Sequence, residues 1–149
     1  MQNERLTLDS WVKTLLDEAR IGHLATATKD GSPHVIPICY AFDGKAIYSS
    51  LDEKPKRTAP ANLRRVKNII ANPSVALVVD LYSENWQDLR YVIVRGVAEI
   101  VHGGGEHEQA IGLLREKYSQ YLEMNLKGLP VIKIIPTKIT AWRAATSTC

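Results

Sequence analysis

The sequence is poor in cysteine and has no long apolar run, and both shortages limit what the chain can be. Its 149 residues include only two cysteines, Cys39 and Cys149, too few for the disulfide framework of a small secreted domain. No segment approaches the ~20 consecutive apolar residues of a membrane-spanning helix, and the first residues lack the apolar core of a signal peptide. We therefore expect a cytoplasmic protein without membrane contact.

Aromatic residues are also scarce, at 7% of the chain, and the net charge of +3 is distributed unevenly. Six of the 19 basic residues fall between Lys54 and Lys67, a segment without any acid, and acids outnumber bases in the rest of the chain. A local basic patch suits a small anionic ligand better than an extended nucleic-acid surface. The patch also lacks the interleaved aromatic residues on which bases stack. We expect no nucleic-acid partner.

The four histidines do not form a metal-binding pattern. His23, His34, His102 and His107 show no metal-ligand spacing with cysteines or carboxylates,. The glycine run at residues 103–105 is not followed by the Lys-Ser or Lys-Thr pair of a phosphate-binding loop. The sequence therefore predicts no metal site and a simple turn at the glycines.

Changes in hydrophobic period divide the chain into short elements without a linker, which indicates one domain over residues 1–149. Turn residues such as Asp43-Gly44 separate the strands and favour hairpins. The run 74–80 is almost continuously apolar and predicts a strand buried on both faces. Hairpins joining short strands, with helices between them, favour an antiparallel barrel with helices at its rim. The expected helices cover residues 8–19, 60–72 and 110–121, and the expected strands cover residues 21–28, 34–42, 46–50, 74–80, 89–101, 131–135 and 138–143.

The strongest chemical signal is a pair of serines, Ser49 and Ser50, followed by the basic segment. Hydroxyl groups together with lysine and arginine side chains supply the donors that a phosphate group requires. Arg64 and Arg65 fall in the first turns of the second helix, where free backbone N–H groups and the helix dipole also favour an anion. The alternative is a solvated basic face on a short helix.

Five segments in order along the chain resemble the pyridoxamine 5'-phosphate oxidase-related family. They are IGHLATATKDGSPHVIP at 21–37, YSS at 48–50, NIIANPSVAL at 68–77, VRGVAE at 94–99 and IPTKITAW at 135–142. Together these segments span nearly the whole chain.

The resemblance implies a six-stranded antiparallel split β-barrel, mainly β with flanking helices, that forms a homodimer with a flavin in the groove between subunits. In such proteins the second strand runs along the flavin ring, and the third strand supplies hydroxyl groups. Basic residues at the head of the next helix hold the phosphate, and the fifth strand adds a polar contact from the other subunit. At these positions the chain has Val35, Ile36 and Pro37 on the second strand and Ser49 and Ser50 on the third. The helix head has Arg64 and Arg65, the loop before it adds Lys54, Lys56 and Arg57, and the fifth strand has Tyr91.

Two departures from the family pattern bear on the cofactor and the reaction. The second strand lacks the Arg and Lys that flank it in true pyridoxamine phosphate oxidases, and the C-terminus lacks their basic motif, so we do not expect that oxidation. The segment DEKPK at 52–56 is similar to the branch expected to use the deazaflavin coenzyme F-420. The resemblance thus implies an oxidoreductase that uses FMN or, alternatively, coenzyme F-420 on a small-molecule substrate. A flavin or haem carrier without turnover is the alternative function.

Overall fold

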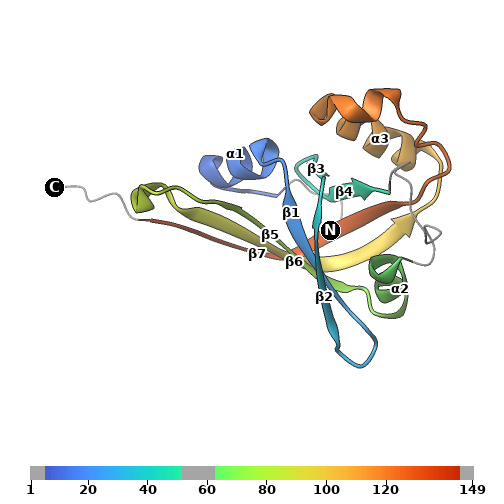
Figure 1. The fold of residues 1–149 in the computed structure, drawn as a ribbon, viewed down its shortest axis with the longest axis horizontal. Helices are drawn as coiled ribbons and strands as arrows, with labels where there is room; N and C mark the ends of the chain where they lie inside the picture. Colours follow the sequence, from blue (N-terminus) through green and yellow to red (C-terminus); the bar gives the residue numbers. More distant parts are fainter. Residues whose placement is uncertain (1–5, 52–62, 145–149) are drawn as a thin grey trace.

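The computed structural model describes residues 6–51 and 63–144. Within these ranges it contains a mainly β fold, in which three α-helices surround one antiparallel sheet of seven strands (Figure 1). The helices are α1 (Ser10–Glu18), α2 (Arg64–Ala71) and α3 (Gly105–Lys117), and two short 3-10 turns, η2 (Trp86–Asp88) and η3 (Ser119–Glu123), lie between elements. The strands are β1 (Gly22–Ala27), β2 (Pro33–Ile38), β3 (Ala41–Phe42), β4 (Ile47–Ser50), β5 (Ser74–Leu81), β6 (Arg90–Val101) and β7 (Val131–Arg143).

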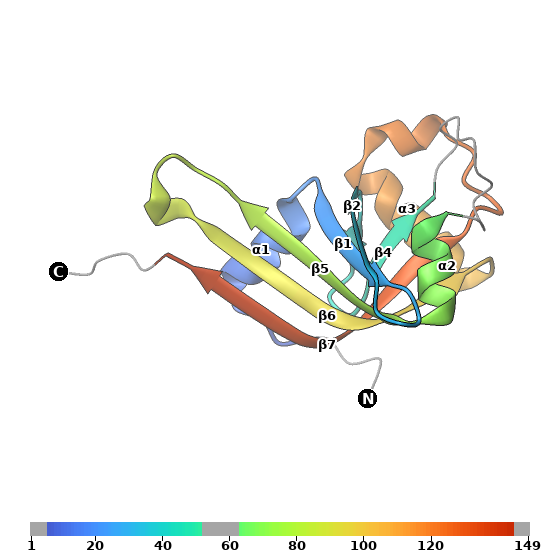
Figure 2. The same cartoon turned by 60° about the horizontal axis from the view of Figure 1, so that its bottom comes forward.

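The strand order explains why the sheet curls. The strands pair in the order β2-β1-β5-β6-β7-β4-β3, so the two edge strands are β2 and β3. These edges follow each other directly in the chain, which brings the two ends of the sheet together as a half-barrel (Figure 2). The predicted antiparallel split-barrel fold, with helices at the rim, is thereby confirmed.

The sheet has seven strands instead of the expected six, because the predicted strand 34–42 is divided at Tyr40. Before this point β2 pairs with β1, and after it β3 pairs with β4. The Tyr118 hydroxyl bonds the backbone where the partner changes: it accepts from the Tyr40 N–H and lies 3.1 Å from the Tyr40 carbonyl oxygen. The Tyr118 hydroxyl accepts from the Tyr40 N–H and directs its single proton toward the carbonyl oxygens of Arg20 and Tyr40. The chain can therefore leave one strand pair and enter another without an orphaned Tyr40 N–H.

The last strand is longer than the sequence predicts. Segments 131–135 and 138–143 form one strand, β7, which pairs with β6 along its length. A register shift beside Gly96 accommodates the interruption at Pro136. A Cβ atom at Gly96 would lie 2.2 Å from the Ile135 carbonyl oxygen. Only glycine fits this close approach of the two backbones.

Strands β5, β6 and β7 form an arm, which we define as residues 76–81, 90–95 and 138–143 (Figure 1). At its base residues 76–78 still pair with β1, and beyond them the arm leaves the barrel. Helix α1 covers one face of the arm, where Val79 and Val92 are fully buried. The opposite face is partly open, since Val78 and Ile93 are only half-buried. The prediction that strand 74–80 is buried on both faces is therefore wrong for a single subunit.

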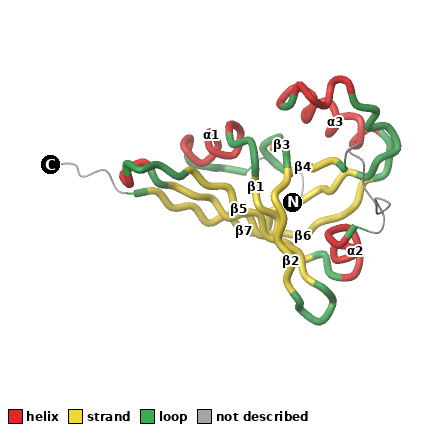
Figure 3. Tube along the Cα trace, viewed as in Figure 1, coloured by secondary structure: helices red, strands yellow, loops and turns green. Residues whose placement is uncertain are grey.

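A second, smaller core lies between the barrel and α3 (Figure 3). Ala110, Ile111 and Leu114 recur at helical spacing and face this core, together with Tyr48 of β4. Tyr118 and Tyr121 follow the helix and belong to the same core, although the helix itself ends at Lys117. The result is a lobe that closes the barrel end opposite the arm.

No helix in the described part of the chain combines the length and the apolar character that crossing a membrane requires.

Candidate functional site

Helix α2 begins with the two arginines that the sequence singled out. Arg64 and Arg65 are its first residues, and no acidic side chain lies in its first turn. Asn68, which is 2% exposed, donates from Nδ2 to the Thr26 hydroxyl of β1 at 3.0 Å. Asn72 also donates from its Nδ2, to the Thr28 carbonyl oxygen at 3.1 Å. These bonds fix α2 on the β1–β2 hairpin, so its positive N-terminal end has a defined place in the fold.

Edge strand β2 belongs to the same hairpin and exposes apolar side chains on one of its faces. His34 pairs with Thr26, the residue that accepts from Asn68, so β2 and α2 both contact the same part of β1. Strand alternation divides the three residues predicted to contact a flavin ring: Val35 and Pro37 face outward, and Ile36 packs toward the core. Val35 is 60% exposed. An exposed apolar strand edge suits the flat ring of a ligand, and the basic helix end on the same hairpin suits an anionic tail.

The His34 side chain adds a polar group to this region. Its Nδ1 atom is buried and has no hydrogen-bond partner among the described residues. Because an unpaired buried polar atom is costly, such an atom marks a position where a ligand or water supplies the partner.

The two serines of β4 do not act as a pair. Both are buried, and alternation along the strand places Ser49 on the face of Ile47 and Ser50 on the face of Tyr48,. The Ser50 hydroxyl donates to the carbonyl of its neighbour Leu51 at 2.8 Å. Only one of the two serines can therefore face a given ligand.

The remaining predicted contacts are far from α2 or outside the described residues. Lys54, Lys56 and Arg57 lie in the segment 52–62, which is outside the described residues. Tyr91 lies at the tip of the arm, whereas α2 ends beside Ala98, whose N–H donates to the Pro73 carbonyl. Seven residues of extended strand separate Tyr91 from Ala98, a distance of roughly 23 Å. One chain therefore does not bring Tyr91 to the arginines.

A polar cluster behind β4 was missed by the sequence analysis, and its groups satisfy one another. The Tyr48 hydroxyl donates to Glu106 Oε2 at 2.9 Å, and Lys133 Nζ lies 2.6 Å from the same oxygen. The bond from Lys133 holds the pKa of Glu106 below its usual value, while burial, reinforced by Glu106, raises the pKa of Tyr48. Glu106 is thus kept ionised and Tyr48 protonated near neutral pH. The cluster joins α3 to the sheet and does not exchange protons in this range.

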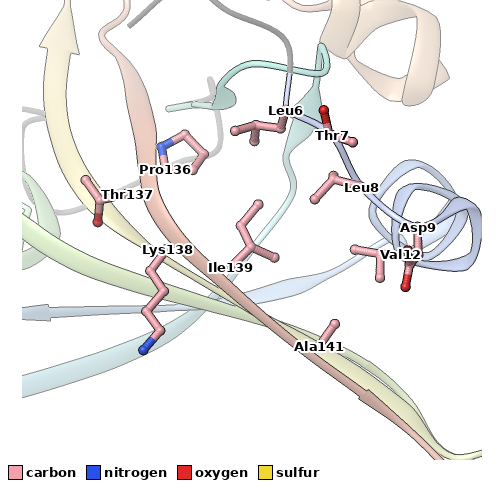
Figure 4. Close-up of a pocket in the computed structure, with 10 residues that line it drawn as sticks. All are labelled: Leu6, Thr7, Leu8, Asp9, Val12, Pro136, Thr137, Lys138, Ile139 and Ala141. Carbon is pink, nitrogen blue, oxygen red and sulfur yellow. The ribbon is translucent and has the colours of Figure 1, made fainter. Parts of the chain in front are cut away.

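The hollow in Figure 4, with a volume of about 400 Å³, lies between the segment before α1 and strand β7. Leu6, Leu8 and Ile139 give it an apolar lining, and Asp9 stands at its border. Lys138 leaves β7 in the direction opposite to Ile139, away from the hollow. Because no cation among its described lining residues faces it, this lining does not suit a phosphate-bearing cofactor,.

A second hollow of about 390 Å³ lies on the open face of the arm, and Tyr91 is the one predicted site residue that borders it. Its floor is formed by side chains of three neighbouring strands, and Tyr82 borders it from the loop after β5. Tyr91 and Trp142 stack there, with ring centroids 5.7 Å apart. The residues come from distant parts of the chain, and only the strand register brings them together.

Comparison with known families identifies the class of protein. The family described as pyridoxamine 5'-phosphate oxidase matches residues 8–143 of this chain. The chain therefore belongs to the pyridoxamine 5'-phosphate oxidase family, as the five sequence segments indicated.

Solved structures of similar fold cover nearly the whole chain. A conserved hypothetical protein of Mycobacterium tuberculosis is 20% identical with a TM-score of 0.74, over 95% of this chain and 88% of the other. An F-420 reductase is 25% identical with a TM-score of 0.64, over 89% and 98% of the two chains. The haem storage protein HutZ of Vibrio cholerae is 16% identical with a TM-score of 0.69, over 93% and 95%. No curated protein sequence matches the chain.

Proposed function

We propose that the chain is one subunit of a homodimeric oxidoreductase that binds a flavin-type cofactor, FMN or the deazaflavin coenzyme F-420, in a groove between two copies. Its substrate is a small organic molecule. The observation that carries the proposal is the basic start of α2, fixed by Asn68 on the β1–β2 hairpin, whose edge strand exposes Val35 and Pro37 on its other face. Membership of the family and the likeness to an F-420 reductase support a cofactor of this kind.

The residues around α2 fit such a group. Arg64 and Arg65 supply charge-assisted donors for a phosphate, and the first backbone N–H groups of the helix point the same way. Val35 and Pro37 offer an apolar edge for a flat ring, and the unpaired Nδ1 atom of His34 offers one polar contact on the other face of β2, level with Thr26 and α2. In this proposal Ser49 or Ser50 contributes a hydroxyl, and Lys54, Lys56 and Arg57 contribute further charge.

Two features support a second copy. Tyr91 lies too far along the arm to reach the arginines of its own chain, so in our proposal it contacts the cofactor held by the partner. The open face of the arm carries half-buried apolar side chains, among them Val78 and Ile93. An apolar face of this kind marks an interaction surface, which a partner arm would cover together with whatever the hollow on this face holds.

The cofactor, when bound, supplies the chemistry of hydride transfer, and the protein positions the reactants and excludes water. The arginines bind and orient the anionic tail. The β2 edge holds the ring plane through Val35 and Pro37, whose rigid side chains lose little entropy on contact.

The test is a binding titration with FMN and with coenzyme F-420, side by side, on the wild type and on the double variant Arg64→Ala/Arg65→Ala. Each charge-assisted contact is worth ~1.5–3 kcal/mol, so the double variant is expected to bind at least a hundredfold more weakly. Lys67→Ala is the matched control, because it removes an exposed charge from the same helix and is expected to leave the affinity unchanged. A folded double variant with wild-type affinity would contradict the phosphate assignment.

A carrier of haem or flavin that does not turn over is the second candidate. The similarity in fold to a haem storage protein favours it. A Soret band after incubation with haemin, without reduction of bound flavin by any donor, would favour the carrier. An oxidised-flavin or deazaflavin spectrum that is bleached by a reductant and restored by an organic acceptor would favour the enzyme.

A further inference from the structure

The hollow on the open face of the arm is built as a platform for a flat ring. Asp80, Tyr91 and Trp142 form one row across three strands, because Asp80 pairs with Tyr91 and Tyr91 pairs with Trp142. Val78 and Ile93 form the next row and complete the floor. Alternation along the strands directs all five side chains to the face opposite α1.

Exposed apolar groups gather at the tip of the arm, where this hollow lies. Of the nine large hydrophobic side chains that are exposed in the described part of the chain, four lie at this tip: Leu81, Tyr82, Trp86 and Trp142. Tyr82 is 65% exposed and Trp142 46% exposed, although both border the same hollow. Solvent-exposed aromatic side chains around a concave surface are typical of a binding site.

The floor of the hollow carries one negative charge, that of Asp80. The Asp80 carboxylate has no hydrogen bond or ion pair with any described residue. Arg90, the cation among the described residues that border the hollow, directs its Nε to the Asp88 carbonyl oxygen at 3.0 Å. A carboxylate next to aromatic faces attracts a cation, since ring faces and the carboxylate are both electron-rich.

We infer that this hollow binds the substrate, and that the substrate is a flat aromatic molecule carrying a positive charge. Its ring lies against Trp142 and Tyr91, and its charge faces Asp80. The assignment as substrate rests on the proposed function, in which the arm of one chain reaches the cofactor of its partner. The preference for a flat cation rests only on residues of one chain.

Three probes of similar size and different charge test the inference: the cation N-methylquinolinium, neutral quinoline and the anion naphthoate. Calorimetric titration of the intact protein, with and without bound cofactor, is expected to give affinities in that order. We expect the cation to bind about fivefold more tightly than quinoline, the worth of one exposed charge contact. Equal affinities for the three probes, or the reverse order, would overturn the inference.

Two pairs of variants locate the site. Asp80→Asn is expected to reduce the affinity for N-methylquinolinium to that for quinoline, while Asp88→Asn, which removes an exposed charge outside the hollow, leaves it unchanged. Trp142→Ala is expected to weaken all ring binding by about fivefold to tenfold. Trp86→Ala, an exposed tryptophan that does not border the hollow, is its control. Equal losses within either pair would place the probes elsewhere and overturn the inference.

The design separates this inference from the proposed function. Cofactor binding without preference for the cationic probe would overturn the inference and leave the proposed function standing. Cationic binding at Asp80 without binding of FMN or coenzyme F-420 would overturn the proposed function and, with it, the assignment as substrate. If Trp142→Ala instead weakens dimer association and leaves probe binding intact, the hollow is a protein contact and the inference fails.

Discussion

The two faces of the arm are made from the same strands and yet differ in what covers them. On one face α1 lies against the strands, and Val79 and Val92 are fully buried. On the other face Ile93 is half-buried, and Trp142 is 46% exposed. Strand alternation supplies apolar side chains to both faces equally, but the chain provides a helix for only one. The uncovered face is therefore the one available for a partner and a ligand.

The largest contrast should appear in stability. Leu16 of α1 is fully buried against the arm and barrel, so Leu16→Ala is expected to lower the free energy of unfolding by about 2–5 kcal/mol. Val78→Ala shortens a half-buried side chain on the open face and is expected to cost less than about 1 kcal/mol. Urea unfolding of the two variants measures the difference. Losses of equal size would show that the two sides of the arm are not covered differently.

The open face is expected to govern association. Ile93→Asp places a charge in the half-buried centre of this face and should weaken the dimer by about 2 kcal/mol, roughly thirtyfold in dissociation constant. The monomer should keep its unfolding midpoint, because Ile93 is not part of the described cores. Sedimentation equilibrium measures the association, and Gln87→Asp, which adds the same charge at an exposed position of η2, is the control. Unchanged association in the Ile93 variant would remove this face from the interface.

Tyrosine hydroxyl groups should follow the same contrast between covered and open regions. Tyr118→Phe deletes the hydroxyl that bonds the backbone of Tyr40 and the Arg20 carbonyl, leaving the buried Tyr40 N–H unpaired at a cost of about 1–3 kcal/mol. Tyr82→Phe, at an exposed site, should be neutral. Thermal unfolding of the two variants provides the measurement, and a stable Tyr118→Phe protein would mean that the strand division does not depend on this hydroxyl.

The smallest effect concerns the pH dependence of stability. Lys117 Nζ is buried, lies 4.0 Å from the centre of the Tyr40 ring, and has no hydrogen-bond partner among the described residues. Burial and the nearby Arg20 lower its pKa from 10.5 to about 8. Between these two values the unfolded chain binds more protons than the folded chain, so stability rises with pH across this window.

Lys117→Met is expected to lose that rise, while Lys127→Met, which removes an exposed lysine, should retain it. Unfolding midpoints measured from neutral pH upward test this, and a slope shared by wild type and both variants would contradict the shifted pKa.

The sequence predicted those parts of the fold that depend on neighbouring residues. Hairpin turns such as Asp43-Gly44 and the helix face containing Val12 and Leu15 appear where local pattern placed them. The division of β2 from β3 could not be predicted, because it depends on a hydroxyl of Tyr118 that lies 78 residues from Tyr40. Long-range contacts of this kind leave no local signal.

The candidate site shows the same limit. The position of Arg64 and Arg65 at the start of a helix followed from the pattern, and the opposite directions of Ser49 and Ser50 were available from strand alternation alone. The hollow around Trp142 was not foreseeable, because its residues become neighbours only through the register of three strands.

The central claim, a flavin-type cofactor held between two copies, is tested most directly by sedimentation velocity followed at the absorption of the bound cofactor, with FMN and coenzyme F-420 supplied in turn. We predict that one of the two sediments with a dimer, and that Arg64→Ala/Arg65→Ala leaves the dimer intact but without colour. Cofactor that sediments with a monomer, or a dimer that carries neither cofactor, would contradict the account.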